Sequence, residues 1–158
     1  MGKGPKKGYT YRWIPARLKD AGGRIVPRSF LRLFAYAAKE ALRDPPGRGP
    51  LIEPPHLVQA LKATSNDRVN ELREEYPFVA RLANLRGQTM LMAKPNVIRL
   101  LAKPADEEDG FGKDGSSAFE ELLRVGVLEI RADTRIDVPD IYRYGYGIKR
   151  KGGAASPR

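Results

Sequence analysis

The sequence predicts a mainly α-helical protein with a small β wing, in which a helical, lid-like segment precedes a winged helix-turn-helix domain. Apolar residues recur at helical spacing in several segments that Pro and Gly residues separate. Near the C-terminus, one such segment, residues 116–124, runs into two short β-prone segments on either side of Asp133-Thr134-Arg135. A helix that leads into a hairpin is typical of the closing half of a winged helix.

The composition excludes several kinds of site. With 41% hydrophobic residues, the 158-residue chain has enough apolar side chains for a core. It has no cysteine and a single histidine, His56, which excludes disulfides, thiolate zinc sites and histidine clusters. No segment has the apolar length of a transmembrane helix, and no apolar region follows the basic N-terminus as in a secretory signal. We therefore expect a cytoplasmic protein with no cofactor and no membrane partner.

Basic residues are concentrated at the two ends of the chain. The net charge is +10, and residues 1–50 contain twelve Lys and Arg against three Asp and Glu. Residues 51–125 contain ten against twelve, and residues 126–158 contain seven against four. This distribution favours a polyanion partner, because Lys and Arg near phosphates release counterions. Nucleic acid, DNA rather than RNA, is the predicted partner, and an acidic protein surface is the alternative.

The first 50 residues are expected to form an arm and a lid-like segment. Residues 1–8, rich in Gly and Lys, are predicted to be a flexible basic arm. Residues 9–14 are aromatic and β-prone, and a short helical turn is expected from Pro15 to Gly22-Gly23. We expect the aromatic residues to pack on the domain rather than to stack on bases. Residues 9–50 make up the lid-like segment and its linker, residues 44–50.

The clearest helix of this segment has Ser29 as its expected N-cap. Its predicted apolar stripe consists of Phe30, Phe34, Ala37, Ala38 and Ala41. Its predicted basic face consists of Arg28, Arg32, Lys39 and Arg43. That face either follows a phosphate backbone or is an ordinary solvated helix face.

Residues 51–148 are predicted to be the winged-helix domain. A helix begins at Pro54-Pro55 with His56 in its first turn as a surface or capping residue, and a second helix start is expected at residues 64–67. Pro77 is expected to kink or restart the helix. Carboxylates and arginines alternate before and after Pro77, which predicts an exposed face laced with salt bridges rather than a catalytic site. These residues are Glu71, Glu74, Glu75, Arg68, Arg73 and Arg81.

We expect a strand at residues 89–92, then a helix that begins at Pro95, and then a Gly-rich acidic loop at residues 103–115. The last helix follows this loop, and Ser116-Ser117 is expected to cap it. The loop lacks the alternating ligand positions of a calcium site. The carboxylates of Glu120 and Glu121 on the last helix would repel DNA phosphates, so we do not expect this helix to read bases in the major groove. Either the wing and the basic tail, residues 149–158, contact the backbone, or the domain contacts protein.

Three segments, Gly8–Pro15, Asp20–Leu31 and Val138–Gly153, resemble the C-terminal region of large bacterial P-loop ATPases of the AAA/STAND type. In that family a nucleotide-binding domain is followed by a helical lid and then by a winged helix. The resemblance implies that Arg28 has the position of the lid arginine that senses the terminal phosphates of the nucleotide. The chain contains no Gly-x-x-x-x-Gly-Lys-Ser/Thr loop, so by itself it is not expected to bind or hydrolyse ATP, or to be an enzyme.

The predicted function is that of a non-catalytic, regulatory winged-helix module that contacts nucleic acid, mainly the DNA backbone, as the rear part of a P-loop ATPase. The predicted nucleic-acid contacts are Arg32, Lys39, Arg43, Arg131, Arg135, Lys149, Arg150 and Lys151. The alternative is a protein-interaction module that docks on an ATPase domain or on another subunit.

Overall fold

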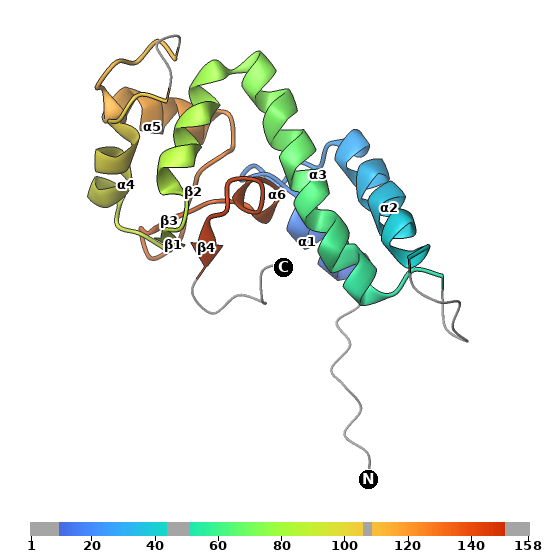
Figure 1. The fold of residues 1–158 in the computed structure, drawn as a ribbon. Helices are drawn as coiled ribbons and strands as arrows, with labels where there is room; N and C mark the ends of the chain where they lie inside the picture. The colour runs from blue at the N-terminus through green and yellow to red at the C-terminus, as the bar shows by residue number, and fades with distance from the viewer. Residues whose placement is uncertain (1–9, 44–50, 106–108, 151–158) are drawn as a thin grey trace.

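The structure, a computed structural model, describes residues 10–43, 51–105 and 109–150 (Figure 1). Its helices are α1 (Thr10–Leu18), α2 (Pro27–Ala41), α3 (Pro54–Glu75), the 3-10 helix η1 (Pro77–Leu85), α4 (Lys94–Leu101), α5 (Gly115–Arg124) and α6 (Asp140–Arg143). Its strands are β1 (Thr89–Met90), β2 (Glu129–Ile130), β3 (Ile136–Asp137) and β4 (Lys149–Arg150). The prediction of a mainly helical protein with little β-structure is confirmed. Among the helices described, none combines the length and the apolar character needed to cross a membrane.

The N-terminal aromatic run is helical, so the β-prone interpretation of residues 10–14 is wrong. These residues form the first half of α1, which continues through Pro15 to Leu18. Ile14 and Leu18 lie one turn apart and are both buried, which stabilises a helix that local propensity does not favour. Arg17, on the same helix, pairs with the buried Asp140 of α6. Tertiary contacts therefore decide the conformation of this segment.

Helix α2 begins earlier and buries a different face than predicted. Val26 is its N-cap and Pro27 its first residue, so Ser29 lies inside the helix and is buried. The buried positions are Ser29, Leu33 and Ala37, spaced four residues apart, whereas Phe30 remains 40% exposed. This buried stripe packs α2 along α3 (Figure 1). The predicted linker, residues 44–50, lies outside the described residues, and the helices on its two sides pack together.

Helix α3 is continuous from residue 54 to residue 75, and the second helix start expected at residues 64–67 is wrong. The hydroxyl of Thr64 donates to the carbonyl of Ala60 at 2.9 Å. The hydroxyl of Ser65 donates to the carbonyl of Ile141 at 2.6 Å and accepts from the backbone N–H of Gly145 at 2.7 Å. Both hydroxyls therefore satisfy buried polar groups and do not cap a helix.

The two ends of α3 agree with the prediction. At the N-terminus, Nδ1 of His56 accepts a hydrogen bond from the backbone N–H of Glu53 at 3.0 Å, and the Glu53 side chain caps the first turn in return. His56 is thus a capping residue. At the C-terminus, Pro77 ends α3 and begins η1.

The strands join the C-terminal part of the chain to its middle. β2 and β3 form an antiparallel hairpin in register Ile130 to Ile136, and the predicted hairpin is confirmed. Met92, two residues after β1, forms an antiparallel bridge with Ile136. β1 pairs in parallel with β4, so that Thr89 lies opposite Lys149. The first two residues of the predicted tail are therefore part of the fold.

Helix α5 is capped by Asp114, not by Ser116-Ser117. The Asp114 carboxylate accepts from the backbone N–H groups of Ser116 and Ser117, each at 3.0 Å. These bonds and the bond from the Ser117 hydroxyl hold the pKa of Asp114 below its usual value. The expected stop is confirmed, because α5 ends at Arg124 and Gly126 follows with a φ of +78°.

Candidate nucleic-acid interface

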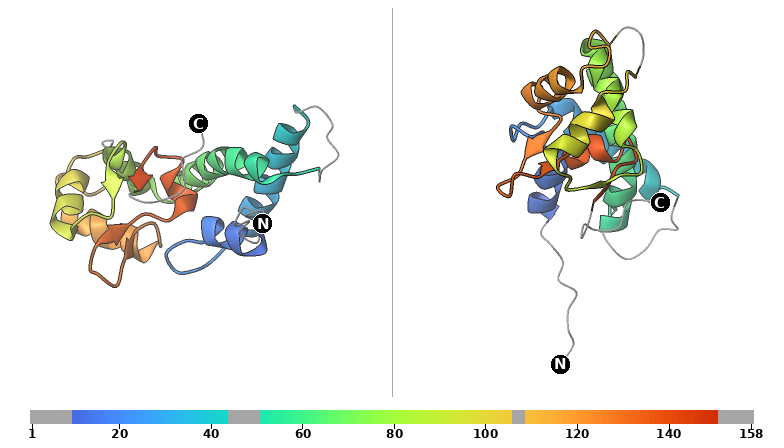
Figure 2. Two further views of the ribbon diagram at one scale, coloured as in Figure 1. Left: turned by 90° about the horizontal axis from the view of Figure 1, so that it is seen from below. Right: turned by 90° about the vertical axis from the view of Figure 1, so that its left-hand side faces the viewer.

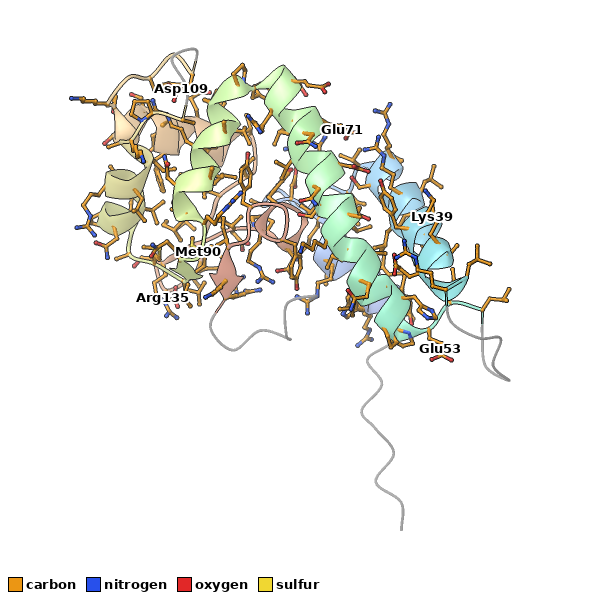
Figure 3. The ribbon with its side chains drawn as sticks, viewed as in Figure 1. Lys39, Glu53, Glu71, Met90, Asp109 and Arg135 are labelled. Carbon is orange, nitrogen blue, oxygen red and sulfur yellow. The ribbon has the colours of Figure 1, made fainter. Side chains whose placement is uncertain are left out.

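The predicted basic face of α2 turns two of its arginines toward α3. Arg28 and Arg32 both contact the carboxylate of Glu71, at 3.2 and 2.7 Å (Figure 3). Arg32 also lies 3.5 Å from the carboxylate of Asp67. Asp67 and Glu71 offset part of the charge of these arginines, so a phosphate backbone would have to compete with two carboxylates for them.

The other two residues of that face lie toward the C-terminus of α2. The ammonium of Lys39 lies 5.6 Å from the centre of the Tyr36 ring. Tyr36 donates to Asp67 at 2.6 Å, and this bond raises the pKa of its phenol because the carboxylate favours the protonated form. Arg43 pairs with Glu40 on its own helix at 2.8 Å.

The predicted arginines of the hairpin and tail also have carboxylate partners. Arg131 lies 3.4 Å from Glu129, and Nε of Arg135 donates to Asp133 at 2.9 Å. Arg150 contacts Asp137 at 2.8 Å, and only 3% of the Asp137 side chain is exposed. Arg150 therefore compensates a buried charge.

Two predicted contacts remain, both at the end of the chain. Lys149 lies on β4, where its backbone N–H donates to the carbonyl of Gln88 at 2.9 Å. Its side chain is exposed, and within the described part of the chain it has no ion pair. Lys151 lies outside the described residues.

The carboxylates of α5 are exposed but paired. Glu120 lies 3.1 Å from the ammonium of Lys94 on α4, and Glu121 lies 2.6 Å from Arg124. Because Lys94 and Arg124 partly neutralise these carboxylates, Glu120 and Glu121 repel phosphates less than their charges in the sequence suggest. The two pairs leave α5 without a free cation for base contacts, because Arg124 is its only basic residue.

A second group of basic residues meets in a hollow of about 540 Å³ between α3, η1, the segment after α4 and the turn before β4. We call it the basic hollow, and define it by the cations Arg73, Arg86 and Lys103 and the amides Asn66, Asn70 and Asn84. Among the described residues that line it there is no carboxylate. Its size is that of a small-ligand pocket.

Unlike the predicted contact arginines of α2 and the hairpin, the three cations of the basic hollow have no carboxylate partner among the described residues. Arg73, Arg86 and Lys103 are exposed, and their side chains form no ion pair or hydrogen bond with other described residues. Among the described lining residues there are three cations and no acidic side chain, which creates a positive field there. This arrangement can bind an anion without first breaking an internal salt bridge.

The periodicity of α3 separates its charges. Asn66, Asn70 and Arg73 recur at helical spacing and line the basic hollow. Asp67 and Glu71 lie about 100° further around the helix, on the side that α2 covers. Asp67 and Glu71 are therefore engaged by α2, and the side of α3 that lines the basic hollow carries Arg73.

A buried ion pair fixes the loop that supplies Lys103. Arg81 of η1 is fully buried and contacts both carboxylate oxygens of Asp109 at 2.6 Å. The Arg81 guanidinium lowers the pKa of Asp109 to about 2. Arg81 also donates to the carbonyls of Leu101 and Gly112, each at 2.7 Å, and so ties both ends of the loop to η1.

Asn84 and Gly145 complete the framework of the basic hollow. The Asn84 amide donates to the carbonyl of Lys103 at 2.8 Å. Gly145 approaches α3 so closely that an added Cβ atom would lie 3.0 Å from Val69 and 3.1 Å from Ser65. The turn before β4 is thus held against α3, where Gly145 and Tyr146 form one wall.

The basic hollow is not among the sites predicted from the sequence. The prediction that Arg73 and Arg81 lie on one exposed face laced with salt bridges is wrong, because Arg81 is buried and Arg73 has no carboxylate partner among the described residues. The spacing of Asn66, Asn70 and Arg73 was the available signal. Arg86 and Lys103 are distant in the sequence, so only folding brings them to the same place.

Other evidence for a site is negative. Within the described ranges, no group of three acidic or histidine side chains is placed to hold a metal ion. Comparisons of the chain with protein families, curated proteins and solved structures found no match. Function is therefore argued from the chemistry of the surface.

Proposed function

We propose that this chain is a non-catalytic winged-helix module that contacts the backbone of nucleic acid, and duplex DNA in particular. Apart from η1, which lies between α3 and β1, the order α3, β1, α4, α5, β2, β3 resembles that of a winged helix. The isolated bridge from Met92 to Ile136 supports the proposal, because it attaches the segment after β1 to the hairpin. We regard β2 and β3 as the wing.

The observation that carries the proposed function is the basic hollow, whose three cations form no ion pair with other described residues. A polyanion that approaches it gains charge-assisted hydrogen bonds and releases counterions. Base reading is not part of the proposal, since α5 exposes Glu120 and has no free cation. Contacts to phosphate give affinity and orientation without sequence preference.

The proposed function is tested by duplex binding followed against salt. Fluorescence anisotropy of a labelled duplex of about two helical turns measures the dissociation constant between about 50 and 200 mM salt. We expect binding at the lower salt concentration, with a steep loss of affinity as salt increases. Two duplexes of unrelated sequence serve as the control and should bind equally well. Undetectable binding at about 50 mM salt would contradict the proposal.

A second candidate function, docking on another protein, is favoured by the outer side of α2. Phe30 and Leu31, in the first half of α2, are 40% and 69% exposed, and Leu42, directly after its last residue, is 85% exposed. Large apolar side chains exposed along a helix are typical of a protein contact. If the partner is another subunit, sedimentation velocity will show concentration-dependent association that the double variant Leu31→Glu/Leu42→Glu abolishes. A monomer at all concentrations would contradict self-association.

We also propose that the module works beside a P-loop ATPase domain, with Arg28 as the nucleotide sensor. The Arg28 side chain is 67% exposed and has one ion pair, at 3.2 Å, so it is accessible to a phosphate. The reading frame upstream of Met1 tests this proposal. If it encodes a P-loop domain, Arg28→Ala should weaken ATP binding by the whole protein. If it does not, Arg28 cannot act on a nucleotide of its own chain.

A further inference from the structure

We infer that the phosphates of the nucleic acid bind in the basic hollow, on the side of the molecule away from α5 and the hairpin. This inference rests on the proposed function and specifies its surface. No residue of α5, β2 or β3 lines the basic hollow. In the left view of Figure 2, α5 and the hairpin lie along one side of the molecule, and η1, α3 and β4 lie along the other.

The charges around the basic hollow favour this side. Two acidic residues of α3, Asp67 and Glu71, are engaged by arginines of α2. On the hairpin side, Arg131 and Arg135 are paired with carboxylates, so phosphates there would have to compete with Glu129 and Asp133. Breaking such pairs cancels part of the gain from a new contact.

The functional groups of the basic hollow match a phosphodiester. The guanidinium groups of Arg73 and Arg86 can each donate two parallel hydrogen bonds to phosphate oxygens. Lys103 supplies a compact charge, and the amides of Asn66 and Asn70 are uncharged donors. Their mixture of charged and neutral donors is the one that proteins use on phosphate and sugar groups.

β4 extends the basic hollow toward the C-terminus. The backbone N–H of Gly87 donates to the carbonyl of Gly147 at 3.0 Å, and Lys149 follows opposite Thr89. Lys149 therefore lies on the strand beside the segment that carries Arg86. Of the contacts predicted from the sequence, Lys149 is the one that continues this surface.

A pair of matched double variants tests the inference. Arg73→Ala/Arg86→Ala removes two cations from the basic hollow, and Arg131→Ala/Arg135→Ala removes two from the hairpin. Each changes the net charge from +10 to +8, so a nonspecific effect of charge is equal in both. Arg73 and Arg86 have no partner among the described residues, so their loss should leave the fold intact. Circular dichroism and thermal unfolding of both variants check this.

The expected result is a difference between the two variants in duplex binding. The variant of the basic hollow should bind about tenfold or more weakly, as two lost charge-assisted contacts imply. Its plot of log affinity against log salt should also lose about two units of slope. The hairpin variant should stay within about twofold of the wild type. Equal losses in the two variants, or no loss in the variant of the basic hollow, would overturn the inference while the proposed function stands.

Two further measurements separate other outcomes. Amide shifts in an ¹⁵N–¹H spectrum on adding the duplex should concentrate at residues 66, 70, 73, 86 and 103, and shifts confined to α5 and the hairpin would overturn the inference. Inorganic phosphate should displace the duplex only in large excess, because it offers a single phosphate. Displacement at comparable concentrations would assign the basic hollow to free phosphate instead. Failure of the wild type to bind any duplex would refute the proposed function itself.

Discussion

The buried pair Arg81–Asp109 allows a sharp test of how the acidic loop is held. Arg81→Met keeps the length of the side chain but removes its charge and its donors. The Asp109 side chain is only 2% exposed. In the variant its carboxylate would keep only two hydrogen-bond donors, the backbone N–H groups of Ala105 and Phe111, each 3.1 Å from a carboxylate oxygen. The carbonyls of Leu101 and Gly112 also lose their donor.

The expected loss of stability is large for a single substitution. Removing one partner of a buried ion pair costs about 3 to 5 kcal/mol, since the remaining charge is left uncompensated. For a chain of this size such a loss lowers the unfolding temperature by roughly 10 °C. Replacing both partners should cost less than Arg81→Met alone, since the double variant Arg81→Met/Asp109→Leu buries no unpaired charge.

Urea unfolding of the wild type, the two single variants and the double variant measures the coupling between the two residues. The exposed pair Arg43 and Glu40 gives a matched control, and its cycle should yield less than about 1 kcal/mol. A loss below about 1 kcal/mol for Arg81→Met, or effects of the two substitutions that simply add, would refute the reasoning.

Three more predictions follow from single sites. Gly115→Ala should lower the free energy of unfolding, measured with urea, by at least about 2 kcal/mol, because the added Cβ atom would lie 2.2 Å from the carbonyl of Ile98. Ser116→Ala, at an exposed position, is the control. Equal stability of the two variants would contradict the close packing of α4 and α5. The pKa of Asp109 is lowered from 3.8 to about 2, so its contribution to stability is complete above about pH 4 and is lost as the pH falls toward 2. The contribution of the Asp109 carboxylate to stability is at most about 2 kcal/mol before solvent screening. If Asp109→Asn has the same acid unfolding curve as the wild type, this contribution is absent. Arg150→Ala should lower stability by about 1 to 3 kcal/mol because the buried Asp137 loses its nearest cation and keeps only Arg131, at 3.9 Å. Unchanged stability with weaker duplex binding would place Arg150 on the contact surface instead.

The fate of the predicted basic residues shows why charge in a sequence is a poor guide to charge at a surface. Arg28, Arg32, Arg131, Arg135 and Arg150 belong to basic segments of the sequence, yet each has a carboxylate partner in the structure. A pair such as Arg32 with Glu71 joins residues 39 positions apart, so no local pattern reveals it. Arg73, Arg86 and Lys103, in contrast, form no ion pair with other described residues.

The sequence by itself determined the helical class, the hairpin, the stop at Gly126 and the capping role of His56, because each depends on a short pattern of residues. The same short-range reasoning was wrong for α1 and for the expected helix start at residues 64–67. There, burial of Ile14 and the bonds of Ser65 to the C-terminal turn outweigh local propensity.

Only the tertiary structure decided which basic side chains are free of carboxylate partners, among the described residues, and can therefore bind an anion. The basic hollow needs Arg73 from α3, Arg86 after η1 and Lys103 after α4, and the buried Arg81–Asp109 pair helps to hold these segments together. The bonds that hold this framework join distant residues: Asn84 and Lys103 are 19 residues apart, and Arg81 and Asp109 are 28 apart. Electrostatic interactions depend on distance in space, so the sequence determined that this protein is basic and the fold determined where that charge can act.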